Sequence, residues 1–158
     1  MLRRRQFVRI AALACAPPLS LAGAAQGAFL TVRGQASYRF SEEQFMSLRS
    51  SVIVTSTPWT RRARFDGPLL SDVLRHAGAD GSRLNVECLD GYSCSIPMSD
   101  LPAYGVILAH SRNGKRMTAR DYGPLWIMYP RDAHPEALST VLSYAKSAWQ
   151  VWRITVVS

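Results

Sequence analysis

Hydrophobic and polar residues alternate along several short stretches, a pattern typical of half-buried strands. Leu84, Val86 and Cys88 alternate with polar neighbours and run into an Asp90-Gly91 turn signal. Residues 52–55 are all β-branched, which predicts a buried strand, and Asn113-Gly114 predicts a tight hairpin turn. Further strands are predicted at 29–32, 93–97, 106–109, 116–119, 125–129 and 149–157.

Helix signals are fewer and unevenly spaced. Ser41 and Gln44 have capping-box spacing, which predicts a short helix through about residue 49. Gly67-Pro68 places a proline where a second helix would begin, and Gly78 would end that helix. A third helix is predicted over residues 136–144, and the arginine-rich stretch 56–66 is expected to be a loop. Strands therefore dominate, and the expected fold class is α+β, a mixed β-sheet domain with short helices.

Length and composition fit one globular domain. The chain has 158 residues, of which 47% are apolar and 19% charged, and it contains no repeat, linker or low-complexity segment. A chain of this size buries roughly two-thirds of the surface that its unfolded state exposes. Disordered and coiled-coil classes are therefore excluded, and residues 28–158 are expected to form a single domain.

The first 27 residues have the layout of a signal peptide. A basic head, residues 1–5, precedes an apolar stretch at 7–25 that Pro17-Pro18 interrupts and that ends in small residues. The double proline and the short apolar length argue against a membrane anchor. We expect cleavage between Ala24 and Ala28 and a periplasmic or secreted protein with no stable membrane span. Arg4-Arg5 resembles a twin-arginine signal, and the choice between that route and the general one stays open.

The net charge gives little support to a nucleic-acid partner. The chain carries +8, from 19 Lys+Arg against 11 Asp+Glu, but four of the arginines lie in the first nine residues. Without them the charge is +4, which is only mildly basic. We therefore expect no nucleic-acid binding.

Cysteine and histidine spacing predicts no metal site. Cys88 and Cys94 flank a turn-like stretch, so they could form a disulfide or could be two small buried thiols, and both readings stay open. Their spacing does not match a Cys-x-x-Cys redox motif, and three scattered histidines add no metal-ligand pattern. Hydrolase, metalloprotease and phosphate-loop motifs are also absent, so no catalytic residue is predicted.

A series of motifs resembles the molybdopterin-binding domain of the sulfite oxidase family, and most closely the short exported bacterial members. The resemblance covers residues 29–157 and implies the fold of that domain. It is carried by Thr55-Ser56-Thr57-Pro58-Trp59, Phe65-Asp66-Gly67-Pro68-Leu69-Leu70, Asp90-Gly91-Tyr92, Asp121-Tyr122-Gly123-Pro124-Leu125-Trp126 and Trp149-Gln150.

Two departures separate this sequence from catalytic members of that family. Those members hold molybdenum through a cysteine near the strand that precedes the Gly-Pro-Leu-Leu segment, where residues 50–57 here contain no cysteine. Members with cofactor also usually carry an arginine where this chain has Trp126. We therefore expect a non-catalytic domain without cofactor that binds a small ligand or a periplasmic protein partner. The alternative is a molybdopterin-dependent periplasmic oxidoreductase with an unusual ligand set or a partner subunit.

The resemblance also implies where a ligand would bind, because it brings three segments together at one end of the sheet. These segments mix aromatic rings, hydroxyls, a carboxylate and a guanidinium, which is the usual lining of a small-molecule site. In the alternative interpretation, Trp59 and Trp126 fill the space of a lost cofactor and Asp90 caps its own turn. The candidate ligand-binding residues are Thr55, Thr57, Trp59, Asp90, Tyr92, Arg120 and Trp126.

Overall fold

The computed structural model describes residues 27–158. The predicted signal peptide, residues 1–27, lies outside the described residues except for Gly27. Within the described part, no helix is both long enough and apolar enough to cross a membrane. In chain order the elements are β1 (Leu30–Arg33), β2 (Ser37–Phe40), α1 (Glu42–Met46), β3 (Ser50–Thr55), β4 (Ala63–Pro68), α2 (Leu70–His76), β5 (Arg83–Cys88), β6 (Ser93–Pro97), α3 (Asp100–Tyr104), β7 (Ile107–Ala109), β8 (Ser111–Arg112), β9 (Lys115–Arg116), β10 (Trp126–Met128), η1 (Arg131–Ala133), α4 (Pro135–Leu138), α5 (Val141–Lys146) and β11 (Val151–Val157).

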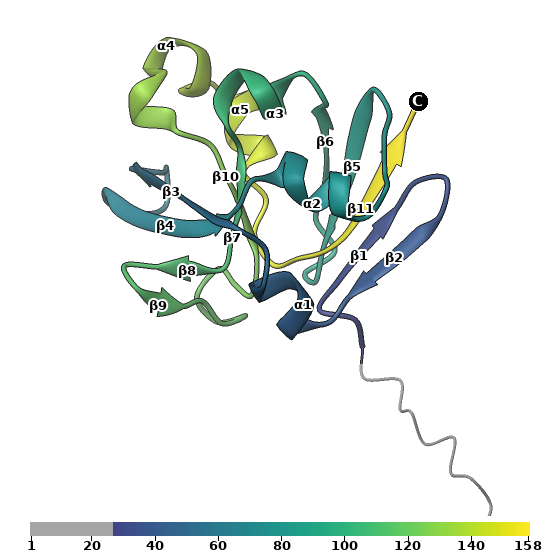
Figure 1. Cartoon of the computed structure of the whole chain (residues 1–158). Coiled ribbons are helices and arrows are strands. Elements are labelled where there is room, and N and C mark those ends of the chain that lie inside the picture. Colours follow the sequence, from purple (N-terminus) through teal and green to yellow (C-terminus); the bar gives the residue numbers. More distant parts are fainter. Residues whose placement is uncertain (1–26) are drawn as a thin grey trace, which may run out of the picture.

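The strands form three small sheets, which Figure 1 shows side by side. One sheet has the order β2-β1-β11-β5-β6, and a second has the order β3-β4-β8-β9. The two-stranded β10-β7 sheet lies between them in this view. Strands β1 and β11 pair in parallel, whereas the other pairs are antiparallel. The predicted α+β class with a mixed sheet and short helices is therefore confirmed.

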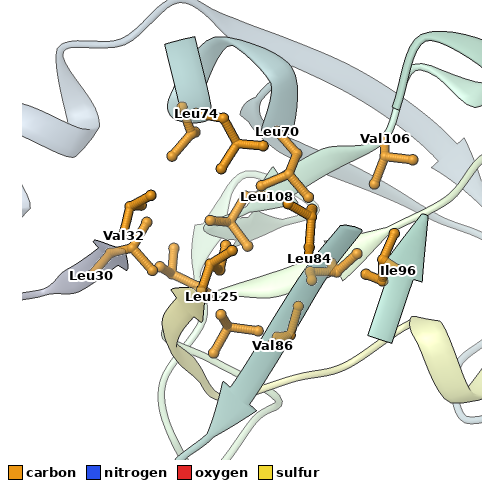
Figure 2. Close-up of a cluster of buried hydrophobic side chains, with 14 of the residues drawn as sticks. Leu30, Val32, Leu70, Leu74, Leu84, Val86, Ile96, Val106, Leu108 and Leu125 are labelled. Atoms are coloured by element: carbon orange, nitrogen blue, oxygen red, sulfur yellow. The ribbon is translucent and has the colours of Figure 1, made fainter. Parts of the chain in front are cut away.

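The main core lies beside the five-stranded sheet and is mostly aliphatic. Alternation along β5 places Leu84 and Val86 inward, where both are fully buried. They meet side chains from β1, β11 and α2, including Leu30 and Leu70. Figure 2 shows these side chains converging from several elements. Burial of each such side chain contributes about 1.5–3 kcal/mol to stability, so this core anchors the fold.

Several sequence predictions are confirmed at the level of single residues. The Ser41 hydroxyl accepts the Gln44 N–H, and the Gln44 side chain accepts the Ser41 N–H, which completes the capping box. Asn113 and Gly114 both have positive φ, 49° and 76°, as a tight β8–β9 hairpin requires. Gly78 has φ 65° where α2 ends.

Strand β3 is less buried than its β-branched sequence predicts. Val52 and Val54 are each 47% exposed, whereas Ile53 and Thr55 face inward. The reason is topological, because β3 is an edge strand of the four-stranded sheet and only one face packs on the interior. The predicted strand is therefore confirmed, but its predicted burial holds for one face only.

The predicted loop 56–66 is confirmed for residues 56–62 and wrong for 63–66, and the predicted helix start at Gly67-Pro68 is wrong. Strand β4 begins at Ala63 and includes Pro68, and α2 starts only at Leu70. A Cβ on Gly67 would lie 2.1 Å from the Leu108 carbonyl oxygen, so this glycine permits close packing of β4 against β7. The Gly-Pro pair therefore marks a tight strand contact rather than a helix N-terminus.

The last predicted elements also need correction. The helix expected over 136–144 is divided into α4 and α5, because Thr140 caps a new helix by accepting the Ser143 N–H. Strand β9 is limited to Lys115–Arg116. Strand β11 starts at Val151, and Trp149 forms only an isolated bridge with Trp126.

Candidate functional site

A cavity of about 320 Å³ opens between three parts of the chain that are distant in sequence. One wall comes from the loop after β3, a second from the β5–β6 turn, and a third from α5 and the segment that follows it. Its size falls at the lower end of the range for small-molecule sites. The lining residues are Trp59, Asp90, Tyr92, Val141, Tyr144, Ala145, Ser147, Ala148 and Trp149.

Aromatic rings connect the cavity to the interior. We define the aromatic cluster as Trp59, Phe65, Tyr122, Trp126 and Trp149. Trp59 and Trp149 meet edge to face, with ring centroids 4.7 Å apart and planes at 78°. Both lie beside Trp126, which is fully buried, stacks on Tyr122 at 4.7 Å and donates its Nε1–H to the Ser147 carbonyl at 3.1 Å. Trp59 itself is 39% exposed, so the cluster runs from the core to the surface.

Thr57 fixes the loop that carries Trp59. Its hydroxyl oxygen accepts the N–H of Trp59 at 3.2 Å and the N–H of Thr60 at 2.9 Å. The Thr60 hydroxyl lies 2.9 Å from the same oxygen. Such side-chain to backbone hydrogen bonds stabilise a turn locally. Thr57 therefore positions the tryptophan, but it is not itself among the cavity-lining residues.

Thr55 and Ser56 attach the end of β3 to η1. The buried Thr55 hydroxyl accepts the Asp132 N–H at 3.0 Å. Ser56 donates both its hydroxyl, at 2.6 Å, and its backbone N–H, at 2.9 Å, to the Asp132 carboxylate. The Ser56 hydroxyl is the main reason that the pKa of Asp132 lies below its ordinary value. This contact braces the loop at its base.

The β5–β6 turn supplies the second wall. The Asp90 carboxylate accepts the Tyr92 N–H at 3.0 Å across Gly91, whose φ is 86°. The Tyr92 hydroxyl donates to the Ala145 carbonyl at 2.7 Å and so connects this turn to α5. Burial raises the pKa of Tyr92 above its ordinary value, so the phenol stays neutral.

A partly buried ion pair holds α5 in place. Lys146 lies 2.6 Å from the Asp100 carboxylate, and their side chains are only 20% and 13% exposed. The Tyr129 hydroxyl donates to the same carboxylate at 2.9 Å. Burial is the largest cause that raises the pKa of Tyr129 far above its ordinary value. Because Lys146 is engaged here, its charge is held at Asp100 and not at the cavity.

The structure brings together some of the predicted site residues and separates others. Three of them, Trp59, Asp90 and Tyr92, line the cavity. The buried Trp126 lies beneath it. Thr55 and Thr57 brace the β3 loop, and Arg120 is exposed and outside the cavity lining. Sequence reasoning missed the α5 wall, namely Val141, Tyr144, Ala145, Ser147, Ala148 and Trp149.

The two cysteines are free thiols, so the disulfide that the sequence allowed is absent. In the β5–β6 register Cys94 lies opposite Val86, and the Cys88 N–H bonds to the Tyr92 carbonyl. The cysteines are therefore diagonal neighbours, about 7–8 Å apart between Cα atoms, beyond the usual reach of a disulfide. Burial raises the pKa of Cys88 to about 12 and that of Cys94 to about 11.

Residues 31–133 match the model of the family described as "Oxidoreductase molybdopterin binding domain". The chain belongs to this family. No curated protein matches the sequence. Among solved structures, this family member is similar to the sulfane dehydrogenase SoxCD from Paracoccus pantotrophus, with a TM-score of 0.63 and 17% identity. The match covers 85% of this chain but only 39% of the SoxCD chain, and it shows the fold alone.

The residues of this family member do not fit a thiolate-held molybdenum centre. Cys88 and Cys94 lie in the β5–β6 hairpin, whereas the resemblance places the thiolate ligand near β3. Across residues 27–158, no three His, Cys, Asp or Glu side chains are grouped to hold a metal ion. Trp126, where the resemblance places an arginine, is fully buried at the base of the aromatic cluster.

Proposed function

We propose that this family member is an exported, non-catalytic binding domain whose aromatic cavity takes a small ligand. The observation that carries the proposal is the cavity of about 320 Å³ between Trp59, Trp149, Tyr92 and Tyr144. A hollow with aromatic walls and few polar groups is the usual form of a small-molecule site. Its walls are braced by Thr57, by the Tyr92 hydroxyl and by the Lys146–Asp100 pair. A preformed site loses less free energy to ordering when it binds.

Ligand-observed NMR with small aromatic, aliphatic and quaternary ammonium compounds would test this proposal. We expect bound compounds to compete for a single site and to lose binding in Trp59→Ala. Trp152→Ala is the matched control, because Trp152 is also partly exposed but does not line the cavity. Equal loss of binding in both variants, or no binding by any compound, would contradict the proposal.

Family membership supports the alternative of a molybdopterin-dependent oxidoreductase. The measurement that separates the two functions is molybdenum per chain in protein purified from its native compartment. The proposed binding domain predicts molybdenum far below one atom per chain. Near-stoichiometric metal would instead support the oxidoreductase, with an unusual ligand set or a partner subunit.

Export is part of the proposal and depends on residues 1–27. Their basic head, interrupted apolar stretch and small terminal residues support cleavage between Ala24 and Ala28. Intact-mass measurement of the periplasmic protein would test it. A mass that still includes residues 1–21 would contradict this part of the proposal.

A further inference from the structure

The charge of the cavity walls differs from that of the whole chain. The protein carries an excess of Lys and Arg, yet the only lining residue with a formal charge at neutral pH is Asp90. Its carboxylate accepts one backbone N–H, from Tyr92, and is exposed. A carboxylate beside aromatic walls favours a ligand of the opposite charge.

Two basic side chains close to lining residues, Lys146 and Arg131, make contacts of their own. Lys146 follows directly after a lining residue, but its ammonium lies 2.6 Å from Asp100. The Arg131 guanidinium lies 5.1 Å from the centroid of the Tyr144 ring and lines a separate small hollow with Thr57. Neither residue is among those that line the cavity, so Asp90 carries the only formal charge in its lining.

The aromatic walls are of the chemical type that attracts organic cations. A ring face carries partial negative charge and attracts a cation within about 6 Å of its centroid. Trp59 and Trp149 stand at 78° to each other and form a corner. Tyr92 and Tyr144 add further aromatic surface to the lining. The Tyr92 hydroxyl is already donated to Ala145, so it is not available to bind an anion.

We infer that the cavity is selective for a small organic cation, of the quaternary ammonium class, with the aromatic walls around its methyl groups and Asp90 as its counter-charge. This inference rests on the proposed function, because it names the ligand class of the same site. The volume of about 320 Å³ sets a limit on the ligand, which must be a small molecule rather than a polymer segment.

The test compares choline with 3,3-dimethyl-1-butanol, which has the same shape but carries a carbon in place of the charged nitrogen. Isothermal titration should give choline a Kd lower by about tenfold or more, because only the cation gains the interaction with the rings and the carboxylate. Asp90→Asn keeps an oxygen that can accept the Tyr92 N–H but removes the charge. We expect it to weaken choline binding several-fold and to leave the alcohol unchanged.

Asp80→Asn is the matched control, since Asp80 is also exposed and also accepts a backbone N–H in its own turn, from Gly81. It should leave binding of both compounds unchanged. Equal affinity for choline and the alcohol, with no effect of Asp90→Asn, would overturn the cation inference and leave the binding function standing. The same holds if only neutral compounds from the NMR set bind. Failure of every compound would overturn the proposed function itself.

Discussion

The main core and the aromatic cluster both bury apolar side chains, but they do so with different shapes. In the main core, Leu30, Leu84 and Ile154 are fully buried beside the five-stranded sheet. In the aromatic cluster, Trp126 is fully buried while Trp59 is 39% exposed. Branched aliphatic side chains interdigitate at high density, whereas flat rings prefer tilted contacts with centroids several ångströms apart. The cluster therefore leaves a hollow at the surface, and the candidate site is found where packing is incomplete.

The largest loss of stability is expected when the Trp126 ring, at the base of the aromatic cluster, is removed. Trp126→Ala should lower the free energy of unfolding by about 3–5 kcal/mol, because it leaves an enclosed void. Urea denaturation of the purified variant would measure this. Leu84→Ala provides the comparison in the main core, with an expected loss of about 2–5 kcal/mol.

Trp126→Phe separates packing from hydrogen bonding at the same position. It keeps an aromatic ring but removes the donor to the Ser147 carbonyl. Trp126→Phe should therefore lower the free energy of unfolding clearly less than Trp126→Ala does. If Trp126→Ala cost less than about 1 kcal/mol, the base of the cluster would not act as core, and the comparison between the two regions would fail.

The next largest loss of stability is expected when the Lys146–Asp100 ion pair, which holds α5 against the rest of the fold, is broken. Asp100→Asn leaves the Lys146 ammonium without its partner, in a position where the lysine side chain is only 20% exposed. Breaking a fully buried pair costs about 3–5 kcal/mol, so about 1–3 kcal/mol is expected for this partly buried one. Thermal denaturation would measure the loss.

Asp72→Asn is the control for this change, because it breaks the exposed Asp72–Arg75 pair on α2. Exposed pairs contribute about 0–1 kcal/mol, so its effect should be slight. Equal losses in the two variants would mean that the Lys146–Asp100 pair does not position α5.

Local sequence patterns predicted the main core better than the aromatic cluster. The alternation of Leu84, Val86 and Cys88 predicts which face of β5 is buried, and the structure confirms it. Strand β4 was not predicted, because its charged residues give the segment a loop-like composition. Two of these residues, Arg64 and Asp66, pair with each other on the outer face of the strand. The alternation typical of a strand was present, since the apolar Ala63 and Phe65 alternate with these charged residues. The arginines nevertheless led to the prediction of a loop.

The candidate site depends on contacts that no local pattern encodes. The resemblance placed Trp59 and Asp90 at one end of the sheet, and both line the cavity. Trp149 was predicted only as the first residue of a strand. Helix α5 was not predicted as a separate element, because most of it falls within the single helix predicted over 136–144. Val141 and Tyr144 have the i, i+3 spacing of one helix face, which could have indicated a shared surface. Which surface they face is decided by the Lys146–Asp100 contact across 46 residues, and that contact has no sequence signature.

A smaller loss is expected at the exposed end of the aromatic cluster. Trp59→Ala should lower the free energy of unfolding by about 1–2 kcal/mol, less than the loss at Trp126, because it enlarges an open hollow and leaves no sealed void. Urea denaturation of Trp59→Ala beside Trp126→Ala would measure the difference. A loss of about 3–5 kcal/mol, with ligand binding unchanged in the folded fraction, would mean that Trp59 fills the core.

The smallest effect is a pH dependence at His110, beyond the end of β7. Its ring meets Phe45 of the main core, and its Nδ1 lies 2.7 Å from the Ser111 hydroxyl. Burial lowers the pKa of His110, the nearby Arg116 lowers it further, and Asp66 opposes them. Between the lowered folded pKa and the ordinary value of about 6.5, the unfolded chain binds a proton that the folded chain does not. The contribution of His110 to the free energy of unfolding is therefore greatest above about pH 6.5, and it decreases as the pH falls toward the folded pKa.

His110→Gln removes this proton uptake and should flatten the acid side of the stability curve. The free energy of unfolding, measured by urea denaturation at several pH values between 8 and 5, should fall less steeply in the variant than in the parent. The difference in slope is at most about 1.4 kcal/mol per pH unit, the limit for one proton. Above pH 7.5 the two curves should run parallel, because the imidazole is neutral in both states. Parallel curves down to pH 5 would contradict the prediction. They would mean that the ring takes up its proton without leaving the core, so that the edge of the main core at His110 is as open as the aromatic cluster.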